Sequence, residues 1–327
     1  MVHRAGDRMT PSRHDADAAV RLPTVAGIFY PAEPARLGRM AAAMLAATAP
    51  RSETGAGAQS GMTFASVTGP ASAASAPPRP LLGLLVPHAG LAYSGRVAAH
   101  GWRLVPDGAT IVILGTNHTA AWLRGVGTWE AGHWRTPLGD VAVDAELASE
   151  ILALGIPFGL DRAAHHDEHS IEVQLPLLRA AAPSARIVPL VVGTGTGASA
   201  IAAGKRLGVL LAQLRTAGAS IVLAISTDMA HYPPADAAVR VTEALLPAIE
   251  GLLPDELARA EATIGRGAGA GPGMACGMCG IEPAVLGLAA LRAMGATRGV
   301  ALASATSADA GADPGRTVGY LSVAFGG

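Results

Sequence analysis

The sequence predicts one α/β domain with a single, mostly parallel central sheet and helices on both faces. Three observations support this fold class. Short apolar runs of strand length recur along the chain, and segments with helical spacing separate them. Three of the runs, 81–86, 110–114 and 220–225, end directly in polar residues that include a histidine. Strands covered by helices on both faces are continuously apolar, so this alternation favours a parallel sheet.

Composition narrows the class of protein. The chain has 327 residues, 50% of them hydrophobic, and a formal net charge of -1. This balance argues against a protein that binds nucleic acid or an anionic membrane through a basic surface. The apolar runs fall short of the roughly 20 residues of a membrane helix, and residues 1–20 lack the apolar core of a signal peptide. We therefore expect a cytoplasmic protein with no nucleic-acid or membrane partner.

The elements of the first third follow from local composition. Residues 1–20 are charged and without periodicity, which predicts a disordered tail in front of a domain spanning 21–327. Apolar residues at helical spacing predict a helix over 33–47. Residues 51–80 are rich in Ala, Ser, Gly and Pro, which predicts a flexible insertion. The strand 81–86, a helix over 96–103 and the strand 110–114 come next.

The rest of the chain continues the alternation. Residues 122–138 predict irregular or hairpin structure, and Asp144 is the expected N-cap of a helix over 144–154. Ser170 is the expected cap of the helix that carries Glu172. Further strands are expected at 141–143, 186–192, 220–225, 300–306 and 317–325, and further helices at 198–217, 235–251, 254–264 and 284–294.

Chemically active side chains gather just past the strand ends. His88 follows the first run, His118 the second, and Asp228 and His231 the third. If these strands are parallel neighbours, the histidines face one crevice at the carboxyl edge of the sheet, where open α/β sheets bind ligands. Imidazole, carboxylate and thiolate bind first-row transition metals. With Cys279, which follows a glycine-rich loop, these residues form a candidate metal cluster.

A second polar segment, 161–172, leaves two interpretations open. His169 and Glu168 are candidates for acid–base or supporting roles, or they belong to a solvated loop and helix cap. For His165 and His166 we favour the solvated loop. A single histidine after a strand is more often structural than a metal ligand. Three histidines at equivalent positions after three strands favour the metal interpretation. Cys276 is expected to be a buried thiol without a ligand role.

Eight motifs in order carry a resemblance to a known family. They are RLPTVAGIFYP, VPHAGLAYSG, LGTNH, TPLGDVAVD, HDEHSIEVQLPLL, ISTDMAHY, MCGIEP and VGYLSVAF. The chain resembles the Memo family, whose bacterial and archaeal members are called AmmeMemoRadiSam system protein B. The resemblance implies a fold like that of the class III extradiol ring-cleaving dioxygenases. It also implies a metal held by His88, His118 and Cys279, with Asp228 and His231 in the same pocket.

The expected function follows from these residues and the resemblance. We expect Fe(II), with Cu or Zn as alternatives. If the protein is an enzyme, we expect a non-haem iron oxidoreductase that carries out redox or oxygen chemistry on a small polar substrate. His169, Asp228 and His231 would move protons or orient ligands, and Glu168 would support the ligands. Ring-cleaving dioxygenases use two histidines and a carboxylate. The resemblance implies the thiolate of Cys279 in place of that carboxylate, which motivates an alternative function. In it the chain is a non-catalytic binding or accessory protein that works with radical-SAM and AMMECR-type partners. A weaker alternative is a zinc-preferring hydrolase.

Overall fold

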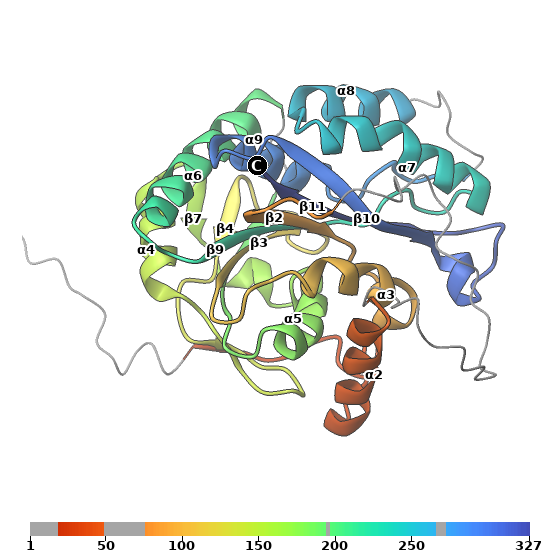
Figure 1. Cartoon of the computed structure of the whole chain (residues 1–327), viewed down its shortest axis with the longest axis horizontal. Helices are drawn as coiled ribbons and strands as arrows, with labels where there is room; N and C mark the ends of the chain where they lie inside the picture. The colour runs from red at the N-terminus through yellow and green to blue at the C-terminus, as the bar shows by residue number, and fades with distance from the viewer. Residues whose placement is uncertain (1–18, 49–75, 194–196, 266–272) are drawn as a thin grey trace, which may run out of the picture.

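The computed structural model describes residues 19–48, 76–193, 197–265 and 273–327 (Figure 1). The predicted tail therefore lies outside the described residues except for Ala19 and Val20, and Val20 begins a strand. Most of the predicted insertion, residues 51–75, also lies outside them. Within the described residues, no helix is both long enough and apolar enough to cross a membrane.

The central sheet confirms the predicted α/β class. Its strands, in spatial order, are β10 (Arg298–Thr306), β11 (Gly319–Gly326), β2 (Leu81–Val86), β9 (Ile221–Ser226), β3 (Thr110–Thr116), β8 (Arg186–Val192), β4 (Val126–Thr128) and β7 (Phe158–Leu160). The four strands β2, β9, β3 and β8 are parallel, and β7 is parallel to β4. Antiparallel pairs attach β11, β10 and β4, so the sheet is mixed around a parallel centre.

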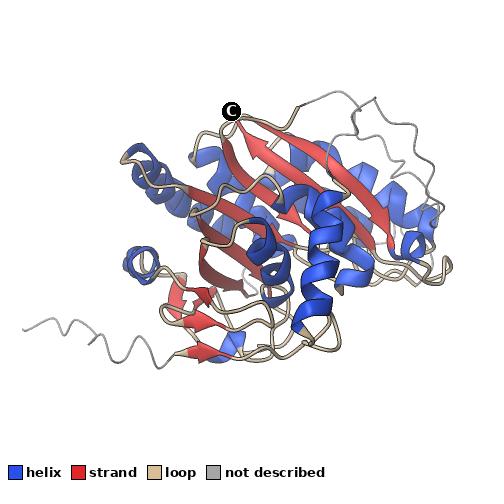
Figure 2. Cartoon of the chain, turned by 60° about the horizontal axis from the view of Figure 1, so that its bottom comes forward, coloured by secondary structure: helices blue, strands red, loops and turns tan. Residues whose placement is uncertain are grey.

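Helices cover both faces of this sheet (Figure 2). They are α2 (Pro34–Ala46), α3 (Leu91–Trp102), α4 (Ala145–Ala153), α5 (Leu175–Ala181), α6 (Ala198–Thr216), α7 (Ala235–Glu250), α8 (Pro254–Gly265) and α9 (Ile281–Ala293), with short 3-10 turns at Ala163–His165, Glu172–Gln174 and Ser307–Ala310. In Figure 1, α6 to α9 lie above the sheet and α2, α3 and α5 below it. The chain is therefore one α/β domain with a central sheet between two helical layers.

Strand β3 explains why the predicted strands are continuously apolar. Ile111 and Ile113 pack into the core beneath the sheet, with α2, α3 and α5. Val112 and Leu114 pack into the core on the opposite face, with α6 and α9. Successive side chains of a strand point to opposite faces, so a strand with a hydrophobic core on each side needs apolar residues at every position.

A smaller sheet holds the N-terminal segment. It joins β1 (Val20–Arg21), β5 (His133–Trp134) and β6 (Val141–Ala142), and β1 pairs in parallel with β5. The predicted irregular region 122–138 thus contributes short strands to both sheets. This pairing fixes Arg21 beside residues more than a hundred positions away.

Some element boundaries differ from the predictions for local reasons. Helix α3 begins at Leu91, five residues before the predicted start at 96, and runs through Gly95. A Cβ at Gly95 would lie 2.6 Å from Sδ of Met44, so this glycine permits close packing against α2. The predicted Ser170 cap is wrong. Its hydroxyl donates instead to the carbonyl of Thr116 (2.8 Å), and the chain passes through a 3-10 turn into α5. Asp144 does cap α4, accepting from the amide of Leu147.

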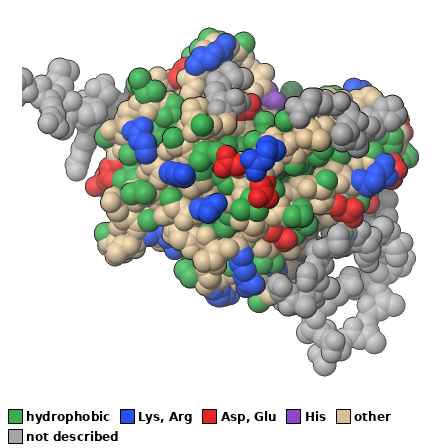
Figure 3. Space-filling model, turned by 90° about the horizontal axis from the view of Figure 1, so that it is seen from above, with side chains coloured by type: hydrophobic (Ala, Val, Ile, Leu, Met, Phe, Trp, Pro, Cys, Tyr) green, Lys and Arg blue, Asp and Glu red, His purple; other side chains and the backbone are tan. Residues whose placement is uncertain are grey.

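The surface carries little net charge. Figure 3 shows basic and acidic side chains interspersed on one face of the molecule. This distribution agrees with the formal net charge of -1.

Candidate metal centre

Three neighbouring parallel strands end at the same level. The register pairs Val86 of β2 with Ser226 of β9, and Leu114 of β3 with Ile225 of β9. His88, His118 and Asp228 each come two residues after the last residue of their strand. The predicted arrangement of neighbouring parallel strands is confirmed, and it brings these side chains to one edge of the sheet.

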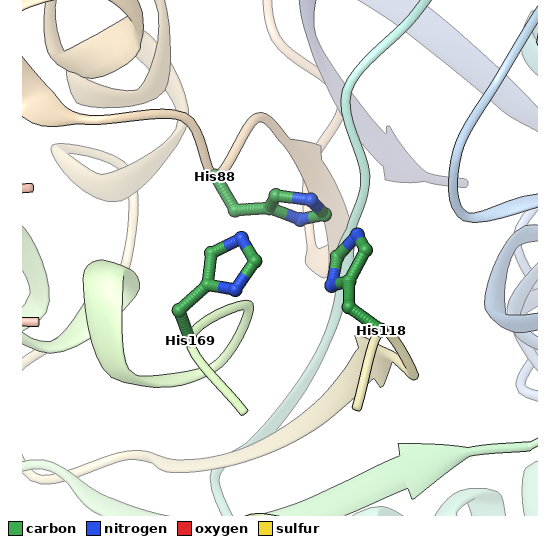
Figure 4. Close-up of side chains that lie close together, drawn as sticks. All are labelled: His88, His118 and His169. Atoms are coloured by element: carbon green, nitrogen blue, oxygen red, sulfur yellow. The ribbon is translucent and has the colours of Figure 1, made fainter. Parts of the chain in front are cut away.

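Three imidazoles converge at this edge (Figure 4). His88, His118 and His169 each offer one nitrogen, and these atoms lie within 4.8 Å of one another. The rings of His118 and His169 are stacked with centroids 4.6 Å apart, and the ring of His88 stands nearly perpendicular to both. The first two histidines follow β2 and β3, whereas His169 comes from the polar segment in front of α5.

Glu168 orients the ring of His118. One carboxylate oxygen accepts from Nδ1 of His118 (3.0 Å) and the other from its backbone amide (2.6 Å). Burial raises the pKa of Glu168, but the hydrogen bonds and charge of His118 outweigh it and lower the pKa to about 2. An ionised carboxylate only accepts, so Nδ1 of His118 carries a proton, and in the neutral form of the ring the lone pair is on Nε2. Carboxylates hold metal-binding histidines in this way.

Ser226 fixes the proton on His88. Its hydroxyl donates to the carbonyl of Ser170 (2.7 Å) and accepts from the side-chain amide of Gln174 (2.9 Å). The same oxygen lies 3.0 Å from Nδ1 of His88. A hydroxyl has one hydrogen to donate, and here that hydrogen is already used. Nδ1 of His88 must therefore donate, which leaves a lone pair on Nε2.

Cys279 lies against this lone pair. Its Sγ is 3.4 Å from Nε2 of His88 and accepts from the backbone amide of Asp228 (3.2 Å). Burial raises the pKa of Cys279 well above its usual value, and the charge of Asp228 adds to this. Burial lowers the pKa of His88 well below its usual value. In the protein alone the two groups are therefore a neutral thiol beside a neutral imidazole.

Asp228 and His231 lie next to the histidine cluster. One oxygen of Asp228 accepts from the backbone amides of His88 (2.7 Å) and Ala89 (3.3 Å). The other lies 3.9 Å from Nε2 of His231, a buried nitrogen with no hydrogen-bond partner among the described residues. Burial raises the pKa of Asp228 and lowers that of His231, so both groups are biased toward their neutral forms.

His169 is the third imidazole of the cluster. Its Nδ1 lies 3.4 Å from the carboxylate of Glu168, and its ring meets the ring of Phe29 edge-on at 4.8 Å. Burial lowers its pKa. The ring is therefore a neutral base next to His88 and His118.

Every site residue predicted from the sequence lies at this edge of the sheet. These residues are His88, His118, Glu168, His169, Asp228, His231 and Cys279. The roles assigned to them remain predictions. The solvated loop expected for His165 is wrong: that side chain is fully buried, with its Nε2 at the carbonyl of Gly127 (3.0 Å), whereas His166 is exposed. Burial raises the pKa of the half-buried Cys276 to about 11.

Sequence reasoning missed the supporting residues. Ser226 and Gln174 set the tautomer of His88, and Arg21 and Glu172 hold the segment before His169. Their contacts span 52 or more positions of the chain. The signal available beforehand was a polar residue at the end of an apolar strand, as at Ser226.

The donor set suits a first-row divalent metal ion. The hydrogen bonds described above place the lone pair of His88, and that of a neutral His118, on Nε2. Metal–nitrogen and metal–sulfur bonds of about 2.0 to 2.3 Å put two ligands of one ion about 3.5 Å apart. The separation of 3.4 Å between Sγ of Cys279 and Nε2 of His88 matches this spacing. The three converging imidazoles therefore fit such an ion, and Cys279 lies at ligand spacing from one of them, His88.

Comparison with known proteins identifies the relatives. A family model described as Memo-like protein matches residues 21–324. A MEMO1 family protein of Methanopyrus kandleri is 34% identical over 309 residues, which cover 93% of this chain and 98% of the relative. One from Sulfolobus acidocaldarius is 34% identical over 319 residues, covering 94% and 99%. One from Aquifex aeolicus is 34% identical over 244 residues, covering 74% and 85%.

Proposed function

This chain belongs to the Memo family, and we propose that it holds one Fe(II) ion at His88, His118 and Cys279 for redox or oxygen chemistry on a small polar substrate. The observation that carries the proposal is the convergence of three imidazoles at the carboxyl edge of the sheet. Cys279 is the proposed third ligand because its sulfur already lies at ligand spacing from His88.

The bound ion would supply a Lewis acid and a site for oxygen or substrate. The surrounding side chains have their own tasks. Glu168 keeps the proton of His118 on Nδ1 and so keeps Nε2 available. The side chains of Asp228 and His231 lie next to each other. The pKa of Asp228 is raised and that of His231 is lowered, which favours the passage of a proton between them.

His169 is the proposed general base. Its ring lies beside the two histidine ligands, and burial keeps it neutral and able to accept a proton. Phe29 covers one edge of this ring, which limits the approach of water from that direction.

Metal analysis after anaerobic purification tests the proposal. We expect about one iron per chain in the wild type and in Cys276→Ser, and little in Cys279→Ser. His169→Ala is expected to keep its iron. Iron retained in Cys279→Ser but lost in His169→Ala would replace the thiolate by a third imidazole. No metal in the wild type, even after reconstitution with Fe(II), would refute the metal function, and stoichiometric zinc instead of iron would favour a hydrolase.

One observation favours a second candidate, a non-catalytic accessory protein for a radical-SAM partner, with an AMMECR-type protein in the same pathway. The nearby carboxylate of Asp228 accepts from two backbone amides with one oxygen, and a thiol stands beside His88. This differs from the two-histidine, one-carboxylate set of ring-cleaving enzymes. Oxygen uptake by the iron-loaded protein on a series of catechols would count against this candidate. Co-purification of a radical-SAM protein, without such uptake, would support it.

A further inference from the structure

Arg21 is a buried arginine with several hydrogen-bond partners. It lies in β1 and is 2% exposed. Its guanidinium donates to the carbonyl oxygens of His165 (3.1 Å), His166 (3.3 Å) and Glu168 (2.7 Å). Its plane also lies over the ring of Trp134, 4.6 Å from the centroid. One side chain therefore holds the backbone that leads directly to Glu168 and His169.

Glu172 is the acidic partner of Arg21. It is fully buried, and its carboxylate forms an ion pair with Arg21. It also accepts from the amides of Thr24 (2.9 Å) and Val25 (3.0 Å) and from the hydroxyl of Tyr30 (2.6 Å). Burial raises the pKa of Glu172, but the charge of Arg21 and these hydrogen bonds outweigh it, and the net shift is downward. The carboxylate is therefore ionised and fixes the N-terminal segment 24–30.

The pair links two segments that both contact the metal centre. Residues 165–169 carry Glu168, which orients His118, and His169, which stacks on it. Residues 24–30 carry Phe29, whose ring lies against His169. A buried ion pair is weak evidence for a role in stability, because desolvation offsets much of the attraction. The contacts instead indicate a role in positioning Glu168 and His169.

We propose that the buried Arg21–Glu172 pair is the positioning device of the metal centre, setting the places of Glu168 and His169 relative to His88 and His118. The inference rests on the proposed metal function. Arg21 and Glu172 lie outside the cluster and act only through the backbone and side chains they hold. The N-terminal segment 24–30 thereby contributes to the surroundings of His169.

Arg21→Lys tests the proposal. Lysine keeps the charge but cannot reproduce the planar fork that reaches several carbonyls at once. We expect the affinity for Fe(II), measured anaerobically against a competing chelator, to fall by about tenfold to a hundredfold. In the metal-free protein, hydrogen–deuterium exchange should become faster in a peptide covering 163–172.

Two controls separate positioning from general damage. Arg162→Lys changes an arginine of the same segment that pairs with Glu130 and lies over Trp129, and it should leave the iron affinity unchanged. Leu147→Ala removes buried apolar contact in α4, within the core on the opposite face of the sheet. It should lower the free energy of unfolding without weakening iron binding.

The outcomes are distinguishable. Wild-type iron affinity in a folded Arg21→Lys protein would overturn the proposal, and so would an unchanged exchange rate. If the wild type binds no iron, the proposed function fails, and exchange in the metal-free proteins still decides whether the pair holds the segment. If Arg21→Lys does not fold, Tyr30→Phe removes a single donor to Glu172. We then expect about threefold weaker iron binding, and an unchanged affinity would refute the proposal.

Discussion

The position of the ring proton decides which nitrogen of His88 and of His118 can bind a metal ion. The hydroxyl of Ser226 and the carboxylate of Glu168 each leave their histidine only one way to place its proton. In their neutral forms, both His88 and His118 therefore present Nε2 without a hydrogen. Rings whose tautomers are set before the ligand arrives need no tautomer change when a metal binds, whereas the Cys279 thiol must lose its proton to become a ligand.

The buried ring of His165 makes a testable contribution to acid sensitivity. Burial lowers its pKa from 6.5 to about 4, so the folded state favours the neutral ring. Its contribution to stability is full above pH 6.5 and is lost as the pH falls toward 4. The loss is of the order of 3 kcal/mol. In urea unfolding of the metal-free protein, His165→Gln should lose correspondingly less stability over this range.

The control for His165 is its exposed neighbour. His166→Gln should show the same pH dependence as the wild type, because that side chain is exposed. Parallel curves for wild type and His165→Gln would show that the buried ring does not resist protonation.

At the scale of elements, the helical layer above the sheet depends on close backbone approach. Helices α6 and α9 make the most extensive helix–helix contact within the described residues. A Cβ built at Gly208 in α6 would lie 2.2 Å from the carbonyl oxygen of Ala290 in α9. The glycine is therefore required by packing between the two helices.

Gly208→Val should force α6 and α9 apart. Overpacking of this kind costs about 1 to 3 kcal/mol, which denaturant unfolding would measure. Gly159→Ala in β7 is the matched control, since a Cβ there meets nothing within 4 Å. Its stability should equal or slightly exceed that of the wild type. Equal stability of Gly208→Val and the wild type would mean that the two helices can separate without loss.

At the scale of the whole molecule, the metal centre joins segments from across the chain. Cys279 meets His88 from 191 positions away, and Glu168 meets His118 from 50 away. An ion bound by such residues stabilises the folded state as a whole, because the unfolded chain does not bring the ligands together. Metal binding and thermal unfolding should therefore be coupled.

Fe(II) should raise the melting temperature of the wild type. At a hundredfold excess over the dissociation constant the gain is about 2.7 kcal/mol, or several degrees for a chain of this size. Anaerobic thermal unfolding with and without Fe(II) would measure it. Cys276→Ser should keep the shift and Cys279→Ser should lose most of it. An equal shift in all three proteins would exclude Cys279 as a ligand.

The sequence by itself determined the layered α/β fold and the place of the histidine cluster. Both follow from local signals: apolar runs such as 81–86, helical periodicity, and a histidine just past each of the three central strands. These signals work because burial on both faces dictates the composition of a strand wherever it sits. The motif order likewise pointed to the family that the comparisons then showed.

Only the tertiary structure decided how the histidine cluster is assembled. It stacked His169 on His118, buried His165, and placed Arg21 under the segment that carries Glu168. It also set the tautomers of His88 and His118 through Ser226 and Glu168. These are contacts between residues far apart in the chain, and they depend on strand register and on where a buried charge finds its partners. Neither the strand register nor the partners of a buried charge can be derived from local patterns of hydrophobicity.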